Sequence, residues 1–323
     1  MGITRFSRLG ERGHRGAAML DSVEDCVDRV LEKVGGQIVL AAPLGLGKPV
    51  QLLNAFYRRV ATNPQMSLHI LTALTLERPV PGSGIAGRLA GPVIGRIYAD
   101  YEDLSYIAPL RARQLPDNIR VSEFYFRAGA MCHVTSAQRN YISSNYTSVA
   151  RDLVAQGVNV VAQLVARRDE AVSLSCNPDL SRHMAQLLEE AGRPCLYLGQ
   201  VHPELPFMGG DAEVEQGFFD FLVDAEEGRR RLFSVPNVAV PLADYATGLH
   251  VSTLVADGGT LQIGIGALGD AVARSCLLRH RENEAYRAML AALKVPVSSV
   301  EQQRTPFGEG LYLSTEMFVD GML

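Results

Sequence analysis

The chain has 323 residues, which is long enough for two domains of ordinary size. Hydrophobic residues make up 47% of it and charged residues 20%, a globular composition that can fill a sizeable core. A formal net charge of -4 without a basic stripe argues against a nucleic-acid partner. No apolar run reaches membrane-spanning length, so no membrane partner is expected either.

The cysteines and the first residues indicate the compartment. Five cysteines are dispersed, odd in number and lack a Cys-x-x-Cys pair, which argues against a disulfide framework and for a reducing, cytoplasmic setting. The basic start has no apolar stretch or small-residue cleavage site, so it is interpreted as a flexible leader rather than a secretory signal.

The first part of the chain alternates predicted helices and strands. In chain order we expect a helix over 21–34, a strand over 37–42, a helix opening at Pro49, a strand over 68–74, a helix over 147–156, a strand over 158–165, a helix over 179–191 and a strand over 195–199. Ser22 is placed to cap the first helix and Gly35 to end it. The strands are continuous apolar runs, which predicts an α/β fold with mainly parallel sheets and helices on both faces.

A second βα pattern follows a Pro-rich and charge-rich stretch at 226–241, which is interpreted as a crossing between domains. Its predicted elements are a helix over 242–255, a strand over 260–265, helices over 270–279 and 282–293, and a strand over 311–315. We therefore expect one domain over 1–235 and the opening of a second over 236–323. The second domain would be incomplete, and strand 311–315 would lie beside neighbours that the chain does not encode.

Two glycine-rich segments resemble nucleotide-binding motifs. GLGKP at 45–49 lacks the first Gly and the final Ser or Thr of a phosphate loop, which excludes that motif. The literal G-x-G-x-x-G match, GIGALG at 264–269, follows a strand and precedes a helix. Its next predicted strand is too distant for a dinucleotide fold, and Glu284, near the required spacing, falls in a helix. We retain for it only a turn whose amides face a ligand at a helix N-terminus.

The remaining candidate residues are cysteines, histidines and one carboxylate. Cys176 with His183, and Cys195 with His202, do not have zinc-ligand spacing, so no metal site is predicted. Glu316 directly follows strand 311–315 and precedes three apolar residues. Ligands of open α/β sheets bind beyond the carboxyl ends of strands, and a poorly solvated carboxylate there is nucleophilic. A structural strand-end glutamate remains the alternative on local sequence alone.

Three stretches resemble the family of acetyl-CoA hydrolases and 4-hydroxybutyrate or succinyl CoA-transferases. They are ADYATGLHVSTLVADGGTLQIGIGALGDAV at 243–272, STEMFVDGML at 314–323 and, more diffusely, the strands and turns of 158–211. The resemblance implies a CoA-transferase-like fold, represented here by the N-terminal portion of a family chain that ends just after the catalytic glutamate motif.

The same resemblance implies the site and its substrates. Glu316 matches the family's catalytic glutamate, and Ile265, between Gly264 and Gly266, matches a residue whose backbone N–H helps to hold the thioester oxygen. The implied enzyme is an acyl-CoA:carboxylate CoA-transferase or acyl-CoA hydrolase that works through a glutamyl anhydride and an enzyme–CoA thioester. It uses coenzyme A and acyl-CoA as substrates, with no permanently bound cofactor.

The expected partners are acyl-CoA, a small carboxylate, and either a second copy in a homo-oligomer such as a homodimer or a partner that supplies the C-terminal half. Without that half, the chain alone is expected to be inactive. Two other functions stay open: a non-catalytic CoA-binding or assembly subunit, and, with less support, an NAD-dependent oxidoreductase that uses GIGALG.

Overall fold

The computed structural model describes residues 16–230, 232, 239–294 and 303–315. The chain divides into two compact units, unit 1 (Met1–Ser234) and unit 2 (Val235–Leu323). The boundary lies inside the Pro-rich and charge-rich stretch at 226–241, where few side chains can contribute to a core.

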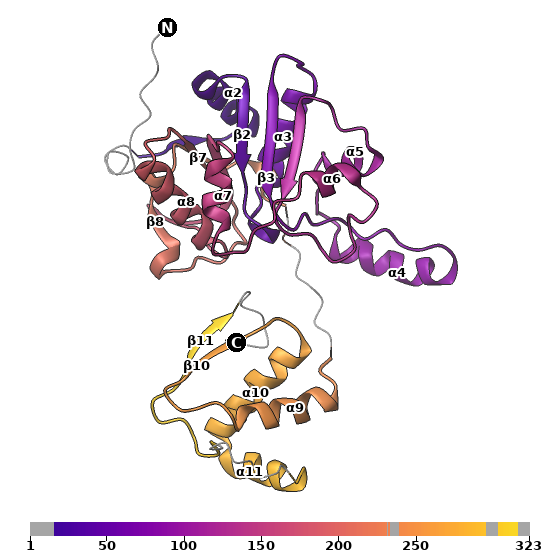
Figure 1. Ribbon diagram of the computed structural model, residues 1–323, viewed down its shortest axis with the longest axis vertical. Coiled ribbons are helices and arrows are strands. Elements are labelled where there is room, and N and C mark those ends of the chain that lie inside the picture. Colours follow the sequence, from indigo (N-terminus) through magenta and orange to yellow (C-terminus); the bar gives the residue numbers. More distant parts are fainter. Residues whose placement is uncertain (1–15, 231, 233–238, 295–302, 316–323) are drawn as a thin grey trace. The chain divides into compact units, whose positions relative to one another are not determined.

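Unit 1 is built on a nine-stranded sheet, shown in Figure 1. Its strands are β1 (Ala18–Leu20), β2 (Gln37–Ala41), β3 (Ser67–Thr72), β4 (Ile119–Glu123), β5 (Val160–Arg168), β6 (Ala171–Ser173), β7 (Leu196–Val201), β8 (Glu213–Glu215) and β9 (Phe221–Val223). Seven of them form a parallel path in the order β1-β9-β7-β5-β2-β3-β4. β6 and β8 extend from β5 as antiparallel neighbours.

Helices cover both faces of this sheet. They are α2 (Val23–Val34), α3 (Val50–Ala61), α4 (Gly84–Ile97), α5 (Ile107–Ala112), α6 (Thr135–Arg139), α7 (Val149–Ala155) and α8 (Pro178–Glu190), with 3-10 turns at Gly45–Gly47, Gly210–Ala212, Gln216–Phe218 and Glu226–Gly228. One buried cluster includes residues of α2, α3 and α5, and another includes residues of α7 and α8. The predicted α/β fold with a mainly parallel, doubly covered sheet is confirmed.

Local sequence explains where these elements begin and end. Ser22 caps α2, because its side chain accepts the Asp25 N–H at 3.3 Å, and Gly35 ends the helix at a φ of 77°. The central strand β2 is apolar, with Ile38 and Leu40 on one face, and Leu40 is fully buried. Such a strand is covered on both sides, which is why it sits in the middle of the sheet.

Unit 2 contains α9 (Leu242–Ser252), β10 (Thr260–Ile263), α10 (Ala267–Arg281), α11 (Asn283–Ala292) and β11 (Tyr312–Thr315). α9 packs on α10, and a small core forms from Leu249, Leu278, Tyr286 and Leu290. β10 and β11 form a parallel two-stranded sheet. β10 thus supplies one neighbour of strand 311–315 within this chain. Further neighbours that the chain does not encode stay a prediction.

Candidate functional site

The predicted glycine turn lies between β10 and α10 in unit 2. β10 ends at Ile263, two residues earlier than predicted, which leaves Gly264, Ile265 and Gly266 outside the strand. All three are exposed, and Ile265 is half exposed. Gly266 caps α10 at a φ of 117°, a conformation that L side chains rarely adopt. The turn thus brings the unpaired amides of a helix N-terminus to the surface.

A backbone contact explains the last glycine of GIGALG. A Cβ on Gly269 would lie 2.0 Å from the carbonyl oxygen of Gly264, whereas a Cβ on Gly264 itself would meet nothing within 4 Å. The first turn of α10 therefore presses against the end of β10. This packing accounts for the spacing of the glycines without a dinucleotide.

The register of the two strands aligns the residues that directly precede the two predicted motifs. Thr315 of β11 is aligned with Ile263 of β10 in parallel pairing. Gly264 follows Ile263 in the chain, and Glu316 follows Thr315. Glu316 itself lies outside the described residues. The described strands nevertheless end side by side and in the same direction, immediately before the glycine turn and before the predicted nucleophile.

Asp257 fixes the opposite ends of these strands. Its carboxylate accepts backbone N–H groups from Gly308 at 2.7 Å, from Glu309 and Gly310 at 3.1 and 3.0 Å, and from Gly258 at 3.1 Å. These N–H donors, led by that of Gly308, lower the pKa of the Asp257 carboxyl. The loop that enters β11 is thereby tied to the loop that enters β10, which sets the register described above.

Arg279 is a buried cation near the C-terminal end of α10. The side chain is fully buried, and it donates to the carbonyl oxygens of Ser252 at 3.0 Å, Val255 at 2.6 Å and Thr305 at 2.7 Å. Its guanidinium also lies 4.0 Å from the ring centroid of Phe307. No carboxylate among the described residues forms an ion pair with it, and burial lowers its pKa. One buried cation therefore joins α9, α10 and the loop before β11.

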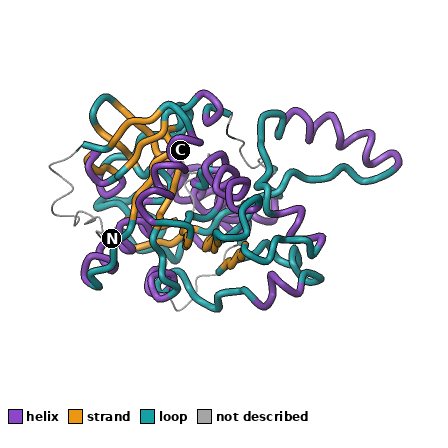
Figure 2. Tube along the Cα trace, turned by 90° about the horizontal axis from the view of Figure 1, so that it is seen from above, coloured by secondary structure: helices purple, strands orange, loops and turns teal. Residues whose placement is uncertain are grey.

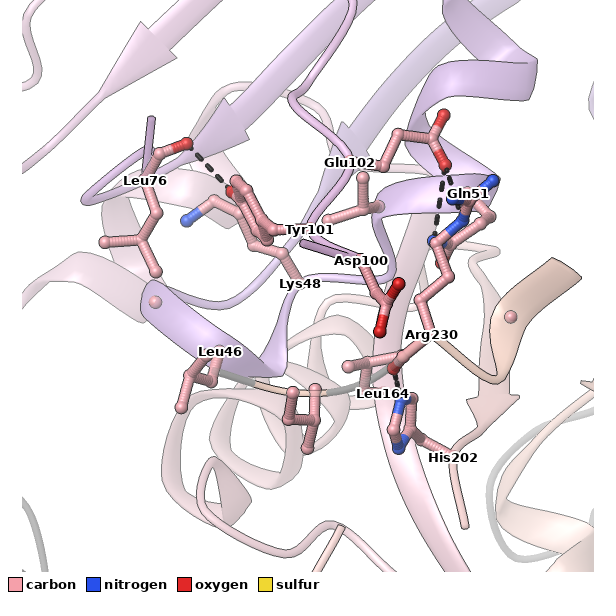
Figure 3. Close-up of a pocket in the computed structure, with 14 residues that line it drawn as sticks. Leu46, Lys48, Gln51, Leu76, Asp100, Tyr101, Glu102, Leu164, His202 and Arg230 are labelled. Atoms are coloured by element: carbon pink, nitrogen blue, oxygen red, sulfur yellow. Dashed lines mark hydrogen bonds and ion pairs between the residues drawn. The ribbon is translucent and has the colours of Figure 1, made fainter. Parts of the chain in front are cut away.

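A second candidate site, a cavity in unit 1, was not predicted from the sequence. It lies at the carboxyl edge of the parallel strands, where GLGKP follows β2 and His202 follows β7 (Figure 3). The strand order reverses its direction between β2 and β5, and such switch points are where open α/β sheets bind ligands. The cavity measures about 40 Å³, which is room for a few water molecules or one small polar group.

Polar side chains form a connected chain along one part of this cavity, whose lining also includes several leucines and a valine. Glu102 accepts from Asn54 Nδ2 at 2.9 Å and lies 3.4 Å from Arg230 Nε. Gln51 joins Glu102 to Gln200, whose Nε2 donates to Gln51 Oε1 at 2.7 Å. Figure 3 shows Gln51 and Arg230 both turned toward the Glu102 carboxylate. These bonds saturate the buried amides and leave Arg230 half exposed.

His202 takes one defined tautomer in the cavity. Its Nδ1 accepts the backbone N–H of Glu204 at 3.2 Å, so Nε2 carries the proton that it donates to the carbonyl oxygen of Arg230 at 2.6 Å. Both ring nitrogens are therefore engaged. The bond to Nε2 holds the segment that follows β9 against β7.

Lys48, which lines the cavity, and Glu123 are two buried groups that interact electrostatically at its back. Lys48 is almost fully buried and donates to the carbonyl oxygens of Ala73 and, at 3.2 Å, Leu74. Desolvation outweighs the attraction of Glu123 and lowers the pKa of Lys48 to about 7, while burial raises the pKa of Glu123. Leu74 has a φ of 45°, which is strained for a leucine.

The pair stabilises that strained backbone. Glu123 accepts the N–H of Thr75 at 3.0 Å and its hydroxyl at 2.9 Å, and the hydroxyl oxygen of Thr75 accepts from Tyr106 at 2.8 Å. Lys48 and Glu123 are 75 positions apart, so only the fold brings them together. The one sequence signal is the Gly-x-Gly-Lys-Pro turn at 45–49, which resembles a phosphate loop and does not by itself predict a buried amine.

Two kinds of feature are not found among the described residues, metal-binding clusters and membrane-spanning helices. Within those ranges, no three side chains of the metal-binding types are grouped closely enough to hold an ion. Among the helices of the same ranges, none combines the length and the apolar character needed to cross a membrane.

Comparisons with known proteins reveal likeness in structure only. No protein-family model matches the chain, and neither does any curated protein sequence. RipA from Yersinia pestis is 16% identical with a TM-score of 0.56, over 96% of this chain and 70% of RipA. A point mutant of RipA is 18% identical with a TM-score of 0.55, over 84% of this chain. The chain spans only 54% of that mutant's length.

Two further solved structures resemble the chain more distantly. A 4-hydroxybutyrate CoA-transferase from Porphyromonas gingivalis is 15% identical with a TM-score of 0.46, over 93% of this chain and 67% of that one. The alpha subunit of a malonate decarboxylase from Acinetobacter baumannii is 14% identical with a TM-score of 0.44, over 88% of this chain and 47% of that one. At these identities the matches to RipA concern the fold alone, a mostly parallel sheet flanked by helices.

Proposed function

We propose that the chain acts in acyl-CoA:carboxylate CoA transfer or acyl-CoA hydrolysis, with Glu316 as the nucleophile and the glycine turn as the oxyanion-binding element. The observation that carries the proposal is the alignment of Ile263 with Thr315. Two parallel strands end at this pair, and Ile263 and Thr315 directly precede Gly264 and Glu316 in the sequence.

The proposed chemistry needs one nucleophile and aligned N–H donors. A Glu316 oxygen attacks the thioester carbonyl carbon and the C–S bond breaks. CoA departs as the thiolate, and the acyl group stays on Glu316 as a mixed anhydride. The thiolate then attacks the glutamyl carbonyl, which releases the acyl carboxylate and forms an enzyme–CoA thioester. An acceptor carboxylate reverses both steps, whereas water releases CoA and restores Glu316. Splitting one transfer into such steps is the usual advantage of covalent catalysis.

The glycine turn supplies what each tetrahedral intermediate requires. Negative charge develops on the former carbonyl oxygen, and preorganised backbone N–H groups stabilise it. The exposed N-terminus of α10 offers such donors, with the Ile265 amide as the one implied by resemblance. The absence of side chains at Gly264 and Gly266 leaves room for a thioester to approach.

The decisive experiment is detection of the covalent intermediate. Intact-mass and peptide analysis after incubation of the complete active protein with acyl-CoA should show CoA attached to the peptide that contains Glu316. Glu316→Gln should remove the adduct and lower turnover by about a thousandfold or more, since an amide cannot form the anhydride. Glu284→Gln, an exposed glutamate of α11, is the matched control and should change neither.

The alternative functions give different results in the same experiments. Attachment of CoA to a cysteine would transfer the nucleophilic role to a thiol. Calorimetric binding of CoA without any adduct or turnover would indicate a CoA-binding or assembly subunit. Binding of NAD instead, weakened by Glu284→Gln, would indicate an oxidoreductase.

A further inference from the structure

A long hairpin projects from unit 1 and exposes apolar side chains. This apolar hairpin, residues 79–99, consists of an extended arm and α4, and Figures 1 and 2 show it reaching away from the body of the unit. No residue of α4 is buried. Val80 is 89% exposed, and Ile85, Leu89 and Val93 are 69%, 73% and 55% exposed.

Hydrogen bonds fix the base of the hairpin, so the fold itself holds the hairpin in its exposed position. Arg111 pairs with Glu77 through two hydrogen bonds, one of 2.6 Å. Tyr101 donates to the carbonyl oxygen of Leu76 at 2.9 Å, and Asp103 accepts the Arg78 N–H at 2.9 Å. The buried pair of Lys48 and Glu123 fixes the preceding residues 73–75 as well. The segments directly before and after the hairpin are thus both held by hydrogen bonds to unit 1.

Only one side of α4 packs on its own arm. A Cβ on Gly87 would lie 1.7 Å from the carbonyl oxygen of Gly82, so this glycine is needed where the helix lies against the arm. Ile85, Leu89 and Val93 recur every fourth residue, which places them along one row of the helix. Their exposures show that this row faces outward. With three interior glycines and Pro92, α4 is a poor helix former in water unless something packs on that row.

The charge of the hairpin indicates what covers it. From Arg78 to residue 99 there are three arginines and no acidic residue, although the whole chain carries -4. Arg88 and Arg96 belong to α4 and form no ion pair with any residue that the structure describes. If two copies paired through this row, their arginines would oppose like charges. A surface of anionic lipid headgroups offers phosphates to the arginines and an acyl boundary to the apolar row.

We propose that the apolar hairpin binds in the plane of an anionic bilayer surface, with Ile85, Leu89 and Val93 entering the acyl boundary and Arg88 and Arg96 contacting lipid phosphates. α4 has 14 residues, about 21 Å of helix, which is too short to span a bilayer but sufficient to lie on it. The sequence expectation of no membrane partner rested on the lack of a spanning run. An interfacial helix needs no such run.

Vesicle co-sedimentation tests the proposal. The chain should sediment with vesicles of phosphatidylglycerol and phosphatidylcholine in equal parts and not with pure phosphatidylcholine. Leu89→Glu should weaken partitioning at least about tenfold, because an acid in the apolar row is repelled by the headgroups. Leu242→Glu, which changes a leucine that is 87% exposed outside the hairpin, should not. Equal sedimentation with both vesicle types, or equal loss in both variants, would overturn the proposal.

The lack of tryptophan in the chain allows a direct probe of the row. Leu89→Trp introduces a single indole, whose emission should shift to the blue with the anionic vesicles, whereas that of Leu242→Trp should not. Circular dichroism should confirm that both variants remain folded. If the Leu89→Trp emission shifts only with protein concentration, and light scattering shows a dimer that Leu89→Glu dissociates, then a second copy covers the row and the proposal is wrong.

Discussion

Replacing Arg279 by methionine should selectively destabilise unit 2. Methionine has a similar length but donates no hydrogen bonds, so the carbonyl oxygens of Ser252, Val255 and Thr305 would lose their partner. Three bonds from a charged donor correspond to a gross loss of roughly 4–9 kcal/mol. The contact with the Phe307 ring disappears too.

Part of this loss is offset, because the native side chain buries a charge without a carboxylate partner and its Nη2 atom has no hydrogen bond among the described residues. Removing an uncompensated buried cation restores several kcal/mol. The expected net destabilisation is therefore about 2–4 kcal/mol, which corresponds to an opening equilibrium that rises about 30- to 700-fold. The stability of unit 2 in Arg279→Lys should fall between those of the native protein and Arg279→Met, because an ammonium group lacks the fixed fork that reaches all three carbonyl oxygens.

Amide hydrogen exchange on the intact chain is the appropriate assay, because unit 1 serves as an internal control. Amides of α9 and α10 should exchange faster in Arg279→Met, while those of β5 and β7 should keep their native rates. Unchanged exchange in α9 and α10 would refute the view that this cation holds unit 2 together. Equal acceleration in both units would show a global effect that the local bonds do not explain.

Three other predictions concern single positions. Gly269→Ala should destabilise unit 2 by about 1–3 kcal/mol in denaturant unfolding, because its Cβ would overlap the Gly264 carbonyl, whereas Gly264→Ala meets no atom within 4 Å and should cost less than about 1 kcal/mol. Because folding lowers the pKa of Asp257, its ionised carboxylate stabilises the folded state. This stabilisation is complete above the ordinary carboxyl pKa of about 3.9 and is lost as pH falls through the lower folded-state pKa. Asp257→Asn should abolish this part of the acid dependence of thermal melting. Folding lowers the pKa of Lys48 to about 7, so between pH 7 and the ordinary lysine pKa the unfolded chain holds one more proton than the folded chain. The urea midpoint of unit 1 should therefore rise with pH through this window. Lys48→Met should lack that rise.

Periodic and capped segments were predictable from the sequence. The α2 helix with its Ser22 cap and the buried strand β2 have local causes, and the structure has both. The three helices and two strands of unit 2 were likewise expected, although β10 is shorter because the glycines after Ile263 leave the strand. The roles of Gly264, Ile265, Gly266 and Glu316 remain predictions.

The missed features depend on contacts between distant residues. β1 and β9 have three residues each, too few for a periodic signal, and they form because β9 pairs with β7 and β1 pairs with β9. The α4 helix runs against propensity, with glycines and a proline in its interior. The cavity wall joins Gln51, Glu102 and Gln200, which no local pattern could have grouped.

The pairing of β1 with β9 has a consequence for how the protein is made. Ala18 pairs with Phe221, so the first described strand must wait until about 200 further residues have left the ribosome, or about 10 to 40 s at ordinary synthesis rates. During that interval β2, β3 and β4 can already assemble from consecutive chain. The far edge of the sheet, beside β7, is the last to close. A nascent chain stalled before residue 221 would therefore present an unpaired strand to chaperones or to other chains, and one stalled a few residues later, once released from the exit tunnel, would not.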